Sequence, residues 1–97
     1  MKIEFNELVR KTLEDFARQG KRIISLDELK AYLLANYDMK SLNYPSVEKN
    51  ILRNFIEVAR IKGYIDFYDK TNYIRISQDW FDIIQEKNRA SQQGDSV

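Results

Sequence analysis

The stretch from residue 45 to residue 76 constrains the fold most, because three local signals follow one another there without a gap. Pro45 suits the first position of a helix, since it has no backbone N–H to lose and its φ is already helical. A helical pattern then runs to Lys62, and Gly63 is the kind of residue that ends a helix. Two short alternating segments follow, separated by Asp69-Lys70-Thr71-Asn72, whose residue types favour a turn. The predicted order is therefore helix, glycine stop and β-hairpin.

The length of the chain allows one domain with one hydrophobic core. A domain of 97 residues buries roughly 60 to 65 per cent of the surface that its unfolded chain exposes. Hydrophobic residues make up 43% and charged residues 32%, a composition typical of globular rather than disordered chains. No apolar run approaches the roughly 18 to 20 residues needed to cross a bilayer, and the N-terminal MKIEFNELVRK lacks the apolar centre of a signal peptide. We therefore expect a cytoplasmic protein.

The side chains needed for most catalytic and metal chemistry are missing from the sequence. It contains no cysteine and no histidine, which excludes disulfides, thiolate zinc sites and imidazole-based acid–base catalysis. The pairs Glu14-Asp15 and Asp27-Glu28 are adjacent, and adjacent helical residues point about 100° apart, which is poor geometry for sharing an ion. The three glycines stand too far apart for a phosphate loop. We expect no metal, no cofactor and no enzymatic activity.

Charge is distributed unevenly along the chain. The net charge is +1, but residues 1–62 hold 12 basic and 9 acidic side chains, whereas residues 63–97 hold 4 basic and 6 acidic ones. Affinity for nucleic acid of any sequence comes from neutralising phosphates. The helical part of the chain is therefore better suited to such a partner than the hairpin and the C-terminal segment.

Two helices and a short strand are predicted before residue 45. Residues 5–17 carry apolar or small side chains at helical spacing, on a helix that ends at Gly20: Phe5, Leu8, Val9, Thr12, Leu13, Phe16 and Ala17. Ser25 and Glu28 have the spacing of a capping box. A second helix is expected from Leu26 to about Asn36, with Leu26, Leu29, Tyr32 and Leu33 inward. The β-branched segment before it, residues 21–24, can pair as a third strand at the edge of the hairpin.

The third predicted helix, residues 45–62, separates an apolar side from a polar arc. With Ser46 at 0° and about 100° per residue, Val47, Ile51, Phe55, Val58 and Ala59 face inward. The opposite arc contains Ser46, Lys49, Asn50, Arg53, Asn54, Glu57 and Arg60, and Ile61 interrupts it. The segment before this helix, residues 37–44, is longer than the 3 to 4 residues of a tight helix-turn-helix.

The polar arc is the main candidate binding surface. Lys and Arg can donate to guanine O6 and N7, and Asn can bond adenine, so Lys49, Asn50 and Arg53 are candidate base readers. Ser46 and the helix N-terminus suit a phosphate, and Arg60 is expected nearer the nucleic-acid backbone. The alternative is an ordinary solvated helix face, which every amphipathic helix has and with which the acidic Glu57 agrees.

The hairpin, residues 64–77, is the second candidate surface. Ile65 and Phe67 on one strand, and Ile74 and Ile76 on the other, are predicted to face the helices. Lys70 and Arg75 could then reach phosphates or a minor groove. The alternative is that the hairpin only covers the core.

The C-terminal segment contains more large apolar side chains than a free surface helix needs. These side chains are Trp80, Phe81, Ile83 and Ile84. They could close the core of one chain against the first helix, or the chain could form a homodimer through Trp80, Phe81 and Ile84 or through the first helix, which we favour. The residues after Lys87 are small and polar, so we expect a folded domain over residues 1–88 and a flexible tail over residues 89–97.

The predicted element order and the segment PSVEKNILRNFIEVARIKGYI resemble the winged-helix superfamily of DNA-binding regulators. The resemblance implies an α+β, mostly helical fold, with a three-helix core, a two- or three-stranded antiparallel wing and an extra C-terminal helix. It also implies that the helix after the turn enters the major groove. The abundance of Ile, Lys, Asn and Tyr is similar to that of small regulators of archaeal viruses and plasmids.

Two functions follow as expectations. The first is a sequence-specific regulator of transcription that binds double-stranded DNA, with Ser46, Lys49, Asn50, Arg53, Asn54, Arg60, Lys70 and Arg75 as its contacts. The alternative is a winged-helix module that binds another protein in a transcription, replication or division complex.

Overall fold

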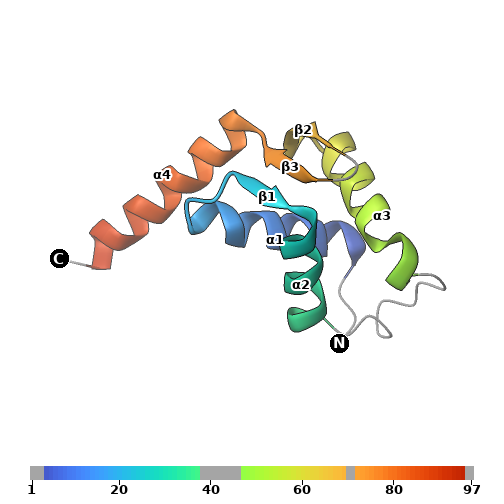
Figure 1. Cartoon of the computed structure of the whole chain (residues 1–97). Helices are drawn as coiled ribbons and strands as arrows, with labels where there is room; N and C mark the ends of the chain where they lie inside the picture. Colours follow the sequence, from blue (N-terminus) through green and yellow to red (C-terminus); the bar gives the residue numbers. More distant parts are fainter. Residues whose placement is uncertain (1–3, 38–46, 70–71, 96–97) are drawn as a thin grey trace.

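Four helices and a small antiparallel sheet make up the described part of the chain, so the fold is α+β and mostly helical (Figure 1). The computed structural model describes the backbone of residues 4–37, 47–69 and 72–95, and the side chains of these residues apart from 47–50 and 90–95. The elements are α1 (Phe5–Arg18), β1 (Ile23–Ser25), α2 (Leu26–Asn36), α3 (Val47–Ile61), β2 (Ile65–Tyr68), β3 (Tyr73–Ile76) and α4 (Gln78–Asp95). None of the helices in these residues combines the length and the apolar character that crossing a membrane requires.

Glycines end α1 and α3 in the same way. Gly20 and Gly63 have φ of 79° and 76°, the left-handed region that side chains with a Cβ rarely enter. The amide of Gly63 donates to the Arg60 carbonyl at 3.1 Å and that of Tyr64 to the Ala59 carbonyl at 2.9 Å. Gly20 and its successor make the equivalent pair of bonds after α1. This is the Schellman arrangement, and it confirms both predicted helix ends.

The start of α2 confirms half of the predicted capping box. The Ser25 hydroxyl accepts a hydrogen bond from the backbone N–H of Glu28 at 3.1 Å. The Glu28 carboxylate accepts from the Lys21 ammonium instead of turning back to Ser25. The cap therefore satisfies one of the free N–H groups of the helix.

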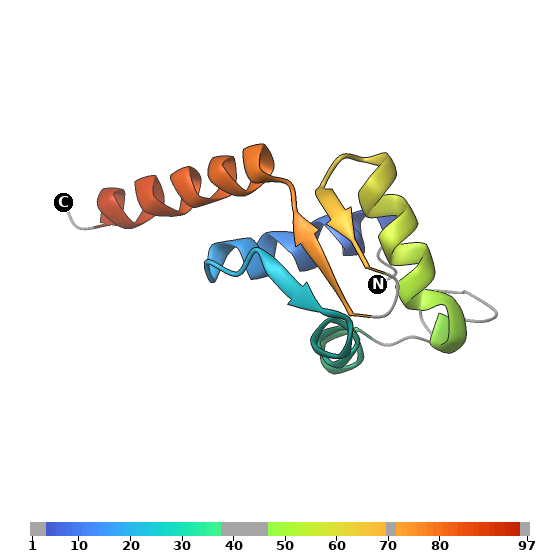
Figure 2. The same ribbon diagram turned by 45° about the horizontal axis from the view of Figure 1, so that its top comes forward.

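The sheet has the order β1-β3-β2, and both pairs are antiparallel. The segment predicted as a third strand is thus confirmed as β1, which pairs with β3 at one edge. Figure 2 shows the sheet lying beside α3, with α2 beginning directly where β1 ends.

A β-bulge in β2 corrects one prediction. Ile65 pairs with Ile76, but Phe67 pairs with Arg75, so the register shifts at Asp66. Because one extra residue reverses the side on which later side chains lie, Phe67 turns to the outer face and is 42% exposed. The prediction that Phe67 faces the helices was therefore wrong.

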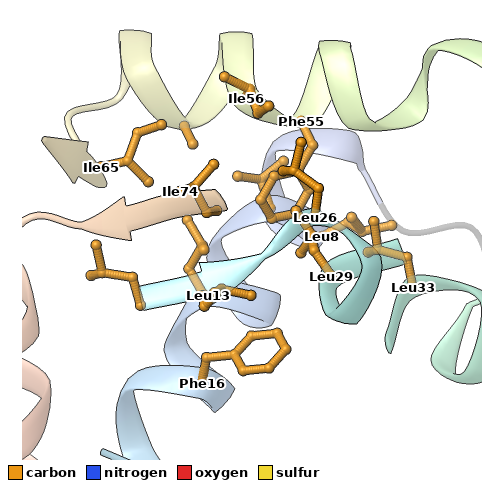
Figure 3. Close-up of a cluster of buried hydrophobic side chains, with 14 of the residues drawn as sticks. Leu8, Leu13, Phe16, Leu26, Leu29, Leu33, Phe55, Ile56, Ile65 and Ile74 are labelled. Carbon is orange, nitrogen blue, oxygen red and sulfur yellow. The ribbon is translucent and has the colours of Figure 1, made fainter. Parts of the chain in front are cut away.

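One core connects the helices with the inner face of the sheet (Figure 3). The stripe predicted on α1 is confirmed, because its members from Leu8 to Ala17 are buried and Phe5 packs at the rim. Leu26, Leu29 and Leu33 contribute from α2, Phe55 and Ile56 from α3, and Ile65 and Ile74 from the sheet. Phe55, which is fully buried, is among the largest side chains in this core.

The first turns of α4 pack on the same core. Ile84 is 5% exposed, and the Trp80 ring stacks on Tyr64 with 4.6 Å between the ring centres. The Gln85 side chain donates to the carbonyl of Ala17, near the end of α1. Figures 1 and 2 show the far end of α4 projecting from the rest of the chain. Because α4 is helical to Asp95, much of the tail expected over residues 89–97 is helical. The flexibility of this tail and the domain boundary at residue 88 stay predictions.

Candidate functional site

Side chains of α3 opposite the core form a polar surface, which we call the outer face of α3 and define as Arg53, Asn54, Glu57, Arg60 and Ile61. All but the partly buried Asn54 are exposed. On the other side of the helix, Ile51, Phe55 and Ala59 are at most 4% exposed. The outer face is therefore carried by a helix whose inner side is held firmly against the core.

Arg60 and Glu57 neutralise each other on this face. A guanidinium nitrogen of Arg60 lies 2.7 Å from a carboxylate oxygen of Glu57, and the two side chains are 53% and 54% exposed. A pair this exposed contributes little to stability. Arg53, by contrast, has no ion-pair partner among the described residues. It is the cation of this face that is available without breaking an ion pair.

Four of the predicted contacts cannot be placed. Ser46 and Lys70 lie outside the described residues, and Lys49 and Asn50 belong to α3 by their backbone only. The structure therefore brings together Arg53, Asn54 and Arg60 from the predicted set, and places Arg75 on the neighbouring sheet.

A groove separates the outer face of α3 from the sheet. It has a volume of about 570 Å³ and is lined by Leu26, Leu52, Arg53, Ile56, Glu57, Arg60 and Tyr68. A smaller hollow of about 260 Å³ continues from it past Arg60 and Tyr68 to Ile65, Asp66 and Phe67. The two hollows share Arg60 and Tyr68, so they connect α3 with β2. Sequence patterns did not indicate the groove, because it depends on how far α2, α3 and β2 lie apart.

On the outer face of the sheet, two arginines converge on one carboxylate. Arg22 Nη2 and Arg75 Nε each lie 2.7 Å from a different oxygen of Asp66. The Arg75 guanidinium also lies 5.5 Å from the centre of the Phe67 ring, within the range of a cation–π contact. Arg75, a predicted DNA contact, is thus already engaged within the chain.

The charges of these arginines also control the ionisation of Asp66. Burial raises the pKa of its carboxyl, but the hydrogen bond and charge of Arg75, together with Arg22, outweigh burial and hold this pKa below its ordinary value. Asp66 is therefore ionised at neutral pH. Arg22 was not predicted as part of any site. The signal that could have indicated it was the predicted pairing of residues 21–24 with the hairpin, which brings Arg22 close to the hairpin side chains.

Three of the four carboxylates in the acidic pairs of the sequence, those of Glu14, Asp15 and Glu28, interact with other side chains. Glu14 pairs with Arg10 and Arg18, and Glu28 with Lys21. Asp15 accepts a hydrogen bond from the Tyr32 hydroxyl. Burial is the main cause that raises the pKa of this hydroxyl, and the hydrogen bond and charge of Asp15 raise it further. Among the described residues, no three acidic side chains are grouped so that they could hold a metal ion.

The side chains considered for dimerisation are largely used inside one chain. Ile84 belongs to the core, and Trp80 and Phe81 pack against it. Among the described residues of α4, the large apolar side chain left mostly outside is Ile83, which is 52% exposed.

Comparison with known proteins adds no relative to this description. No protein-family model matches the chain, and neither does any curated protein or solved structure.

Proposed function

We propose that this chain is a winged-helix protein that binds double-stranded DNA in a sequence-specific manner and regulates transcription. In this proposal α3 enters the major groove, and the hairpin β2–β3 is the wing that contacts the DNA backbone or the minor groove. No residue is assigned a catalytic role.

The observation that supports the proposal is the position of Arg53. Its exposed guanidinium has no ion-pair partner among the described residues, and it lies on a helix whose opposite side is buried. A rigid helix that presents a free arginine can place it against guanine O6 and N7. A second contact by the neighbouring hairpin is supported by the groove beside Arg53, because Tyr68 of β2 is one of its lining residues.

The remaining predicted contacts take different roles in this proposal. Asn54 lies beside Arg53 on the outer face of α3 and is suited to a base edge. Arg60, near the other end of the helix, is suited to a phosphate once it leaves Glu57. Ser46, Lys49, Asn50, Lys70 and Arg75 keep their predicted roles.

The proposal includes a homodimer, as two-fold protein symmetry matches pseudo-palindromic sites. Because Trp80 and Ile84 pack within one chain, the dimer contact would have to use other side chains, and Ile83 is an exposed apolar candidate. A mass measurement of the free protein at several concentrations tests this part: a single mass of 11.6 kDa throughout would contradict it.

Replacing Arg53 by alanine tests the role of α3. If Arg53 contacts a base, Arg53→Ala should weaken binding to a selected duplex by about 1–3 kcal/mol, with the free energy of unfolding changed by about 0.5 kcal/mol or less. The matched control is Arg89→Ala, which removes an exposed arginine from α4. Duplexes selected from a random pool at about 50 mM salt would serve as ligands. Equal affinity of the wild type and both variants would contradict the assignment.

A protein partner is the second candidate, and the groove favours it. Its apolar lining of Leu26 from α2 and of Leu52 and Ile56 from α3 could receive an apolar side chain of another protein. Ile61, which is 72% exposed, adds apolar surface on α3. Failure of the wild type to bind any duplex, together with a co-purifying protein that Ile61→Ser loses, would favour this function over DNA binding.

A further inference from the structure

Four arginines lie on α3 and the sheet or next to them: Arg22, Arg53, Arg60 and Arg75. Three of the four form ion pairs with acidic side chains of the same chain. Arg60 is paired with Glu57, and Arg22 and Arg75 are both paired with Asp66. Arg53 is the exception among the described residues. The positive charge that this surface offers to an anionic partner is thus much smaller than its number of arginines suggests.

The arrangement at Asp66 is that of an anion held by two guanidinium groups. Each carboxylate oxygen accepts from a different arginine, and Arg22 is oriented further by donating its Nε–H to the carbonyl of Ile76 at 2.8 Å. Guanidinium groups bind phosphate and carboxylate oxygens by the same charge-assisted hydrogen bonds. Two arginines that converge on one carboxylate can therefore also converge on one phosphate.

The β-bulge places this carboxylate. Asp66 is the extra residue between the Ile65–Ile76 and Phe67–Arg75 pairs. A bulged residue is left out of the regular pairing and re-aims its side chain. Here the side chain points toward Arg75 on the neighbouring strand and Arg22 just before β1.

Glu57 and Asp66 belong to one continuous surface. Glu57 and Arg60 line the groove beside α3, and Arg60 and Asp66 both line the hollow that continues from it. A duplex lying along α3 and reaching the hairpin would pass both carboxylates. Each would repel phosphates and compete with them for its arginines.

We propose that Glu57 and Asp66 are specificity-determining residues that lower the affinity of this surface for DNA of arbitrary sequence. A phosphate can bind Arg60, Arg22 or Arg75 only if it displaces the carboxylate that is paired with that arginine. Binding therefore depends more strongly on Arg53 and on the base contacts of α3. This inference rests on the proposed function, because it concerns the same surface.

The variants Glu57→Gln and Asp66→Asn test the proposal on a duplex of random sequence. Glu57→Gln releases one arginine and Asp66→Asn releases two. The slope of log K against log salt changes by about 0.9 for each phosphate contact. The slope should therefore steepen by about 1 in Glu57→Gln and by up to about 2 in Asp66→Asn. Affinity at about 50 mM salt should rise several-fold, and more for Asp66→Asn. Circular dichroism would check that each variant is folded.

The matched control is Glu86→Gln, which removes the same charge from an exposed position on α4. A second control is the double variant Asp66→Asn/Arg75→Gln, which should lose about half of the steepening that Asp66→Asn produces. Should Asp66→Asn not fold, Glu57→Gln tests the proposal by itself, since its ion pair is exposed within one helix.

The outcomes separate this inference from the proposed function. If the wild type binds duplex and Arg53→Ala weakens it, but Glu57→Gln and Asp66→Asn change binding no more than Glu86→Gln, only the inference is overturned. If neither the wild type nor any variant binds duplex at about 50 mM salt, the proposed function is overturned and the inference with it. If the wild type binds a selected duplex, and binding to the random duplex appears only in Glu57→Gln or Asp66→Asn, the inference is supported.

Discussion

The two sides of α3 differ in what holds them. On the inner side, Ile51, Phe55 and Ala59 are buried among side chains of other elements. On the outer face, Arg53, Glu57 and Arg60 are exposed, and Arg60 contacts an acidic residue one turn away. Burial of apolar area is worth several kcal/mol for a large side chain, whereas an exposed ion pair is worth about 1 kcal/mol or less. The inner side thus determines the fold, and the outer face is free to serve binding.

The largest expected effect is the loss of Phe55. Phe55→Ala should lower the free energy of unfolding by about 3–5 kcal/mol, because it removes a fully buried ring and leaves a cavity. Urea denaturation followed by circular dichroism measures the change. The matched control is Phe67→Ala, which removes a ring that is 42% exposed and should cost clearly less. Equal losses in the two variants would contradict the contrast between buried and outer faces.

A smaller effect of opposite sign is expected at Thr12. Its hydroxyl is fully buried on α1 and has no hydrogen-bond partner among the described residues, and α1 packs against α3. Because a buried hydroxyl without a partner is costly, Thr12→Val should raise the free energy of unfolding by about 1 kcal/mol. Thermal or urea denaturation measures this. A loss of stability would mean that the hydroxyl has a stabilising role and that this part of the core is not purely apolar.

The spacing of apolar residues and the residues typical of helix ends were enough to predict the side chains that face the core. The apolar stripe of α1, the cap at Ser25 and the stop at Gly63 all depend on residues within one or two turns of each other, so the sequence alone contains them. The third strand was also predicted, because its β-branched residues lie just before the Ser25 cap.

The outer surfaces were predicted less completely, since they depend on register. The bulge at Asp66 turned Phe67 outward and brought Asp66 to Arg22, which is 44 residues away in sequence. No local pattern indicates where such a bulge will lie. The Glu57–Arg60 pair, in contrast, has the i, i+3 spacing of helical ion pairs, and it could have been foreseen. The use of Trp80 and Ile84 within one chain depended on where α4 packs.

We propose that the outer face of α3 and the hairpin β2–β3 receive a duplex, and NMR mapping of the chain tests this proposal. Backbone amide spectra of the 97-residue chain would be recorded while a duplex is added at about 50 mM salt. We predict that shift changes concentrate at Arg53, Glu57, Arg60 and the strands β2 and β3, with α1 and the far end of α4 little affected. Spectra that do not change, or changes that concentrate on α1 and α4, would contradict binding of a duplex at this surface.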